Sequence, residues 1–233
     1  GYTALHAAGW QRRTLIGSGL GVHVGQWASE FASVLMASPA RCSVYAATGH
    51  QCSVTCGRVS FVLGLHGPCA SHDTACSASL VASHASLRAL QRFECDGAVS
   101  AGVNMLLDPA AMRGHAIAGF TSAVGRSHTF DTRADGYARG EATGVLVCQR
   151  ADTSVPLQLA GSAVRQDGRS ASLTAPNGSL GDPIGARSLA TVLLTPLVCT
   201  GIKAGLGHSE STAGVTGLFH LACSLRDRLA PPN

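Results

Sequence analysis

Short apolar runs and longer periodic segments alternate along the chain. Runs flanked by glycine or polar turns predict buried strands at residues 17–25, 98–106 and 144–148. Apolar residues at helical spacing predict helices at residues 27–36 and 77–93. Pro68 favours an extended conformation in the segment that runs to Thr74, just before the second helix. This alternation of strands and helices predicts an α/β fold.

The helix predicted at residues 77–93 begins next to a cysteine. Its apolar positions recur at helical intervals: Leu80, Leu87, Leu90 and Phe93. His84 is the one polar member of this stripe, and no formal charge occurs before Arg88. We therefore expect a buried helix with Cys76 at its N-terminus.

The composition supports a folded domain and argues against several functional classes. Hydrophobic residues make up 45% of the 233 residues and charged residues 13%, enough apolar material for a large core in one or two domains. The net charge of +4 comes from dispersed arginines, with no basic run longer than Arg12-Arg13, which argues against binding to nucleic acid or to a membrane surface. No apolar run is long enough to cross a bilayer.

Nine cysteines, an odd number without a CxxC pair, indicate neither a disulfide framework nor a zinc ribbon. We expect a reducing compartment, the cytoplasm or a plastid. The chain starts at Gly1 without an initiator methionine or a leader and ends on a proline pair, so we expect both ends to be cut from a longer protein.

A glycine-rich polar stretch separates the last two predicted strands. Residues 129–141 predict a structured loop whose charged side chains could pair with one another: Asp131, Arg133, Asp135, Arg139 and Glu141. The composition then changes near residues 151–156, which suggests a boundary at Asp152 between a half at residues 1–151 and a second half at residues 152–233.

Two positions could carry chemistry. Free backbone N–H groups at a helix start favour negative charge, so Cys76 lies where a thiolate nucleophile would be stabilised, although most free cysteines are simply buried. Lys203 is the only lysine among 17 basic residues, and it approaches a helix predicted from about Ser209 together with His208 and Glu210. A capped surface turn is an equally good interpretation of that segment on its own.

The cysteine lies in a distinctive motif. Residues 73–82 read DTACSASLVA, which resembles the nucleophile signature D-T-A-C-S-S-S-L-V-A of β-ketoacyl synthase domains in modular type I polyketide synthases. Further matches follow in family order at residues 45–49, 57–61, 63–68, 130–131, 134–137, 139–141, 166–170, 173–178, 180–184 and 203–210. The resemblance implies a thiolase-like fold of two related α/β halves in αβαβα layers, incomplete at both ends and in the second half.

The same resemblance implies roles for the candidate residues. Cys76 would accept an acyl chain, which a malonyl-type extender then attacks after decarboxylation, in a Claisen condensation of polyketide or fatty-acid biosynthesis. His208 would be the second catalytic histidine, with Lys203 and Glu210 holding its surroundings. A loop near the site would be anchored by Asp131, Asp135 and Glu141. The implied partners are an acyl carrier protein, a second copy in a homodimer and other polyketide synthase domains; phosphopantetheine would arrive on the carrier, and the chain itself would bind no cofactor.

The chain departs from this family inside its second half. Gly178 is followed directly by Ser179 and Leu180, where relatives have a helix, a strand and a His-Gly-Thr-Gly-Thr motif. That block supplies the first catalytic histidine and the threonines that hold the phosphopantetheine arm, so we expect condensation to be severely impaired. The alternative is therefore an inactive or truncated ketosynthase-like fragment with a structural or docking role. The segment from Lys203 to Glu210 argues against a thiolase or a chalcone-type synthase.

Overall fold

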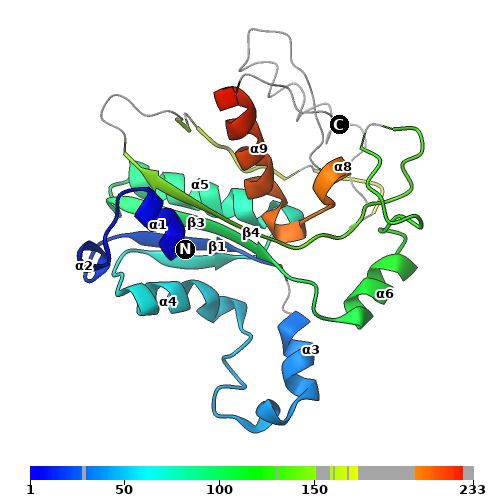
Figure 1. Ribbon diagram of the computed structural model, residues 1–233, viewed down its shortest axis with the longest axis horizontal. Helices are drawn as coiled ribbons and strands as arrows, with labels where there is room; N and C mark the ends of the chain where they lie inside the picture. The colour runs from blue at the N-terminus through cyan, green and yellow to red at the C-terminus, as the bar shows by residue number, and fades with distance from the viewer. Residues whose placement is uncertain are drawn as a thin grey trace.

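A four-stranded sheet in the order β2-β1-β3-β4 forms the centre of the structure (Figure 1). The computed structural model describes residues 1–27, 30–129, 131–150, 158–159, 161–166, 168–172 and 203–227. Strand β1 (Gly21–Gly25) pairs in parallel with both β2 (Cys69–His72) and β3 (Gly97–Asn104), and β4 (Ala142–Gln149) pairs with β3 in the antiparallel direction. All the strands predicted from the sequence are confirmed.

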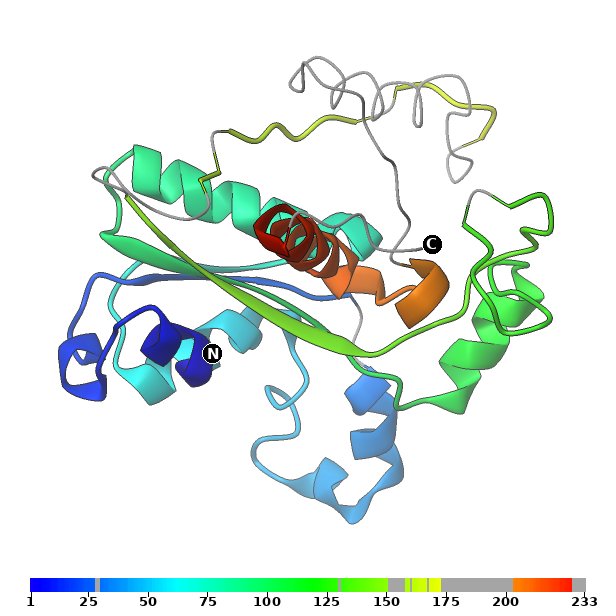
Figure 2. The ribbon, with the colours of Figure 1, turned by 45° about the horizontal axis from the view of Figure 1, so that its top comes forward.

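Helices cover both faces of the sheet. Figures 1 and 2 show α1 (Tyr2–Ala7) and α4 (Cys52–Leu63) on one side and α5 (Ala78–Gln91) and α9 (Ala213–Asp227) on the other. The remaining elements are α2 (Arg12–Leu15), α3 (Glu30–Ala37), α6 (Pro109–Ile117), α8 (Lys203–Leu206) and the 3₁₀ turns η1 (Pro39–Cys42), η2 (Ala75–Ser77) and η3 (Glu210–Thr212). On the α4 side the core is apolar and consists of Leu5, Leu15, Leu20, Val22, Val24, Cys56, Leu65 and Val99.

Helix α5 packs on the opposite face through small side chains. Its buried residues are Ala78, Ser79, Ala82, Ser83, Ser86, Ala89 and Leu90. The predicted stripe is only partly buried, because Leu90 is 4% exposed whereas Leu80 is 44% and Phe93 76% exposed. Small residues let the helix backbone lie close to the sheet, and hydroxyls can pair there: Ser83 Oγ lies 2.9 Å from Ser100 Oγ on β3.

Two glycines bring other backbone segments onto the carboxyl ends of the strands. Gly25 and Gly102 are register partners at the ends of β1 and β3. A Cβ on Gly25 would clash with the backbone of Ala78 and Ser79. One on Gly102 would lie 2.8 Å from Ser79 Cβ and 3.1 Å from Thr212 Cα. The start of α5 and the end of η3 therefore pack directly on these strands.

The charged loop before β4 pairs differently from our expectation. Within residues 129–141, Asp131 and Arg133 form the single ion pair of the described residues, at 2.6 Å. Arg139 instead pairs with carboxylates outside the loop. The exposed Arg133 pairs with the carboxylate two residues away from it. The buried guanidinium of Arg139 pairs with carboxylates of other segments, which the fold brings next to it.

The second half is represented by few of the described residues. After β4 they include α8, η3 and α9 and no strand. The predicted boundary at Asp152 and the junction from Gly178 to Leu180 lie outside the described residues. Among the helices that the structure describes, none is long and apolar enough to span a membrane.

A pair of histidines joins the edge strand to its neighbour. His23 Nδ1 on β1 lies 3.3 Å from His72 Nε2 on β2, and the His23 Nε2 atom is buried without a hydrogen-bond partner among the described residues. Burial, followed by the proximity of His72, lowers the pKa of His23 to about 4, and burial also lowers the pKa of His72. Both rings are therefore neutral at pH 7.

This pair predicts a loss of stability in acid. The pKa of His23 is about 4 in the folded chain and 6.5 in the reference state, so the unfolded chain binds the proton first as the pH falls from about 6.5 to 4. We expect the free energy of unfolding measured with urea to be about 2 kcal/mol lower at pH 5 than at pH 7.5 because of this group. His23→Phe should flatten that dependence, whereas the exposed His66→Phe should not. Equal pH dependence in the two variants would contradict the assignment.

Candidate active site

The candidate nucleophile lies in a strained turn between β2 and α5. Cys76 is exposed and occupies the centre of η2, two residues before α5 begins, so its predicted place at a helix start is confirmed. Ala75 has a φ of 51°, a conformation that costs energy for a residue with a side chain. Asp73 Oδ1 accepts a bond from Ala75 N at 3.3 Å, and Ser77 Oγ donates to Thr74 O at 2.9 Å. These bonds hold the turn in place.

His208 lies on a short extended segment before η3. Its backbone N donates to Ala138 O at 2.6 Å and its carbonyl accepts from Gly140 N at 2.9 Å. Gly207 precedes it with a φ of 73°, and a Cβ there would lie 2.9 Å from Ala138 O. The residues before β4 therefore hold the His208 backbone from one side, and the side chain is almost fully buried.

Tyr137 packs against the histidine ring. Its ring meets the His208 ring at 86° with a centroid distance of 4.8 Å, an edge-to-face contact. Burial and then the charge of Glu210 raise the pKa of Tyr137, while Arg139 lowers it. The turns η2 and η3 also contact each other directly. The Cys76 turn therefore lies next to the turn that follows His208.

The environment keeps the His208 imidazole neutral. Burial lowers the pKa of His208 to about 4; the positive charge of Lys203 acts in the same direction, and Glu210 opposes it. Among the described residues, its Nδ1 atom is buried and has no hydrogen-bond partner. A neutral imidazole carries one N–H group, which can donate a hydrogen bond to an oxygen that gains negative charge.

Lys203 and Glu210 affect His208 in different ways. Lys203 opens α8 with an exposed side chain, and its carbonyl accepts from Gly207 N at 2.9 Å. Glu210 is buried, has a φ of 43° and forms hydrogen bonds to Arg139. Lys203 thus acts on the imidazole through charge, while Glu210 fixes the turn that follows it.

Arg139 completes this arrangement, and its role was not predicted from the sequence. Its side chain is 1% exposed and donates to Glu210 from Nε, to Glu210 Oε2 from Nη2 at 3.0 Å, and to Glu30 Oε1 at 2.7 Å. Glu30 Oε2 in turn accepts from Leu107 N and Asp108 N, both at 2.7 Å. The one available signal was the scarcity of glutamate, since the chain has only four.

The three expected supporting carboxylates bind near the loop rather than the reactive groups. Asp131 pairs with Arg133, which holds the pKa of that carboxyl far below its usual range. Asp135 Oδ2 accepts from Ala123 N at 3.1 Å, and Glu141 Oε1 accepts from Leu106 N at 2.8 Å. Each therefore anchors a backbone segment on the way to the site.

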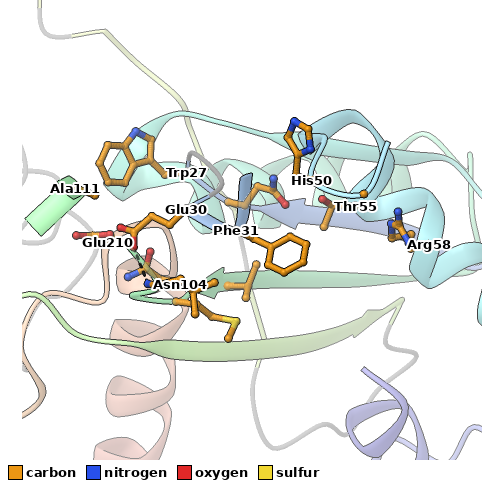
Figure 3. Close-up of a pocket in the computed structure, with 14 residues that line it drawn as sticks. Trp27, Glu30, Phe31, His50, Thr55, Arg58, Asn104, Ala111 and Glu210 are labelled. Carbon is orange, nitrogen blue, oxygen red and sulfur yellow. Dashed lines mark hydrogen bonds between the residues drawn. The ribbon is translucent and has the colours of Figure 1, made fainter. Parts of the chain in front are cut away.

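A cavity of about 230 Å³ lies beside this site, between α3, the start of α4 and the end of β3 (Figure 3). Trp27, Phe31 and Asn104 line its walls, with Glu210 at one end and Arg58 at the other. Cys76 and His208 do not line it. The described residues contain no group of three or more side chains that could hold a metal ion.

Comparison with known families assigns both parts of the chain. The family "Beta-ketoacyl synthase, N-terminal domain" matches residues 1–154, and the family "Beta-ketoacyl synthase, C-terminal domain" matches residues 179–233. The first match alone covers more than half of the chain and includes Cys76.

Polyketide synthases are among the similar proteins. A phenolphthiocerol/phthiocerol polyketide synthase protein of Mycobacterium tuberculosis is 36% identical over 275 aligned positions, which cover 100% of the chain and 15% of that protein. The highly reducing polyketide synthase PKS6 of Gibberella zeae is 33% identical and is covered over 11% of its length. The chain thus spans less than a fifth of these relatives. The alignment has more positions than the 233-residue chain, so the relative has residues in this region that the chain lacks.

Solved ketosynthase domains have the same fold. The ketosynthase from module 6 of the bacillaene synthase of Bacillus subtilis 168 matches 100% of the chain with a TM-score of 0.86 and 27% identity. An oxazolomycin ketosynthase domain of Streptomyces albus matches with a TM-score of 0.84 and 26% identity. The chain covers 46% and 48% of those two chains. It has the thiolase-like α/β fold, and it belongs to the β-ketoacyl synthase family.

Proposed function

We propose that this chain carries the acyl-accepting site of a β-ketoacyl synthase that acts in polyketide or fatty-acid biosynthesis. The observation that supports this most strongly is the contact between η2, which carries Cys76, and η3, which begins two residues after His208. The relatives that the chain resembles are polyketide synthases and ketosynthase domains.

The first step is transfer of an acyl group to Cys76. Its thiolate attacks the carbonyl carbon of a thioester, a new C–S bond forms, and the phosphopantetheine thiol of an acyl carrier protein leaves with the proton that Cys76 gave up. The exposed position of Cys76 in η2 leaves the sulfur open to such a donor. Backbone N–H groups at the start of α5 favour the negative charge that forms on the thioester oxygen.

The second step is the condensation, in which His208 would take part. A malonyl-type extender loses CO₂, its carbanion attacks the acyl thioester on Cys76, and the Cys76 thiolate leaves as the new C–C bond forms. His208 is neutral and buried, so its N–H can stabilise the negative charge on the extender's thioester oxygen. Lys203 would help to keep that imidazole neutral.

The interrupted motif order favours a second candidate, a remnant that accepts an acyl group but does not condense it. The sequence passes directly from Gly178 to Ser179 and Leu180 and lacks the segment with the first catalytic histidine. The two steps are chemically separable, because acylation needs the nucleophile turn, whereas decarboxylation also needs donors to the extender. We therefore expect loading at Cys76 and little condensation.

The proposed reaction requires partners. An acyl carrier protein would deliver the phosphopantetheine-bound groups, and other polyketide synthase domains would supply and process them. The eight described cysteines are all free, which supports a reducing compartment such as the cytoplasm or a plastid.

A second copy of the chain is also proposed, against the α4 and β2 side. Strand β2 is an edge strand of the described sheet, and α4, which lies against it, leaves Phe61 86% and Val62 74% exposed. In a dimer with a two-fold axis, this surface of one copy would be buried against the same surface of the other copy.

Acyl loading tests the nucleophile. Incubated with an acyl N-acetylcysteamine thioester, the chain should gain one acyl group, and peptide mass spectrometry should place it on Cys76. Cys76→Ala should lose at least about 90% of the label, because the attacking sulfur is gone. Cys42→Ala, which removes another exposed thiol, is the matched control and should load normally. Persistent loading in Cys76→Ala would refute the assignment.

Sedimentation velocity tests the second copy. The chain should sediment as a dimer, and Phe61→Glu should give a monomer because a buried unpaired carboxylate destabilises an apolar interface. Phe120→Glu, at an exposed aromatic residue away from α4, should remain dimeric. A monomeric parent chain would contradict this proposal without affecting the nucleophile assignment.

A further inference from the structure

A buried cluster of charges lies directly behind the His208 turn. Arg139 bonds to both Glu210 and Glu30, and all three side chains are at most 10% exposed. His115 is a fourth member, with Nδ1 at 3.9 Å from Glu210 Oε1. Such a cluster is costly to build, because each group loses its hydration on folding. The cluster is therefore a candidate for a functional role.

Two sets of contacts link the segment around residue 139 to the His208 turn. Arg139 and His208 form a parallel β-bridge, flanked by the bonds from Gly140 N to His208 O and from His208 N to Ala138 O. The Arg139 side chain then holds Glu210, two residues further along, through both carboxylate oxygens. Ala138 and Gly140 thus hold the backbone of His208, and the Arg139 side chain holds Glu210 two residues later.

The geometry of Glu210 explains why such a hold is needed. Its φ of 43° is a conformation that L-residues rarely adopt and that persists only when surrounding contacts impose it. The bidentate guanidinium supplies those contacts, and Glu30 anchors it from α3, a segment far away in the sequence. Without Arg139, the buried Glu210 carboxylate would lose both of its guanidinium bonds, while Glu30 would keep its bonds from Leu107 N and Asp108 N, and the turn would lose a main restraint.

We infer that Arg139 is a positioning residue of the site, which acts through Glu210 and uses Glu30 as its anchor to hold the His208 ring against Tyr137. This rests on the proposed function only in giving His208 a role in condensation. The Arg139 side chain bonds to Glu210 and Glu30 rather than to the nucleophile turn, so we expect acyl loading to be independent of it. Arginine is required because a lysine ammonium cannot bond to both oxygens of Glu210 and to Glu30 in one plane.

The test follows the His208 ring in Arg139→Met. In the parent chain, the Tyr137 ring at 4.8 Å should shift the His208 ring protons in the NMR spectrum, and burial should make carbethoxylation of the imidazole by diethylpyrocarbonate slow. In Arg139→Met that ring-current shift should disappear and carbethoxylation should become about tenfold faster, because the turn opens locally. Loading at Cys76 should stay within about twofold of the parent.

Controls separate positioning from a general loss of structure. Arg133→Met removes an exposed arginine of the same loop and should leave the His208 signals unchanged. Glu210→Gln should reproduce part of the effect, and Arg139→Met added to it should produce less than the sum of the two, because both act on one turn. A folded Arg139→Met with unchanged His208 signals, or fully additive effects, would overturn the inference.

If Arg139→Met does not fold, Arg139→Lys decides the question. The ring-current shift should then fall to an intermediate value, because the ammonium keeps only part of the hold. An unchanged His208 signal in that variant would equally overturn the inference. Loss of loading in Cys76→Ala, by contrast, reports on the proposed function alone.

Discussion

The close approach of two turns to the ends of β1 and β3 is the constraint on which the site depends. Gly25 and Gly102 lie side by side there, and the atoms that would clash with a side chain at either position belong to α5 and η3. Because the parallel strands end at the same edge of the sheet, the turns that follow from distant parts of the sequence meet above it. The position of Cys76 next to the His208 turn is a consequence of this backbone packing.

Hydrogen bonds and ion pairs then hold the turns that backbone packing brings together. The site contains backbone conformations that cost energy at Ala75 and Glu210, and hydrogen bonds hold each of them. The bonds around Ala75 come from its own neighbours in the sequence. Those around Glu210 come from Arg139, which is anchored in turn by Glu30. The hydrogen bonds that hold the nucleophile turn thus come from its own residues, whereas those that hold the histidine turn come from distant segments of the chain.

Much of this could be predicted from the sequence, for identifiable reasons. The strands were visible as short apolar runs between glycines, and the motif around Cys76 indicated both its place before a helix and its family. The face of α5 could not be read from hydrophobicity, because serines and alanines pack against the sheet while Leu80 is exposed. The partners of Arg139 could not be predicted either, since Glu30 lies 109 positions away and no periodicity connects the two. Long-range ion pairs depend on the topology of the fold, which cannot be read directly from a single sequence.

The contact between η2 and η3 predicts that Cys76 and His208 lie close together, and their proximity can be measured directly. A nitroxide spin label on Cys76, in a chain whose other exposed cysteines are replaced, broadens NMR signals of nuclei near it. We expect the ring signals of His208 and Tyr137 to be broadened, while those of His6 on α1, at the opposite end of the sheet in Figure 1, stay sharp. A His208 signal as sharp as that of His6 would contradict a shared site.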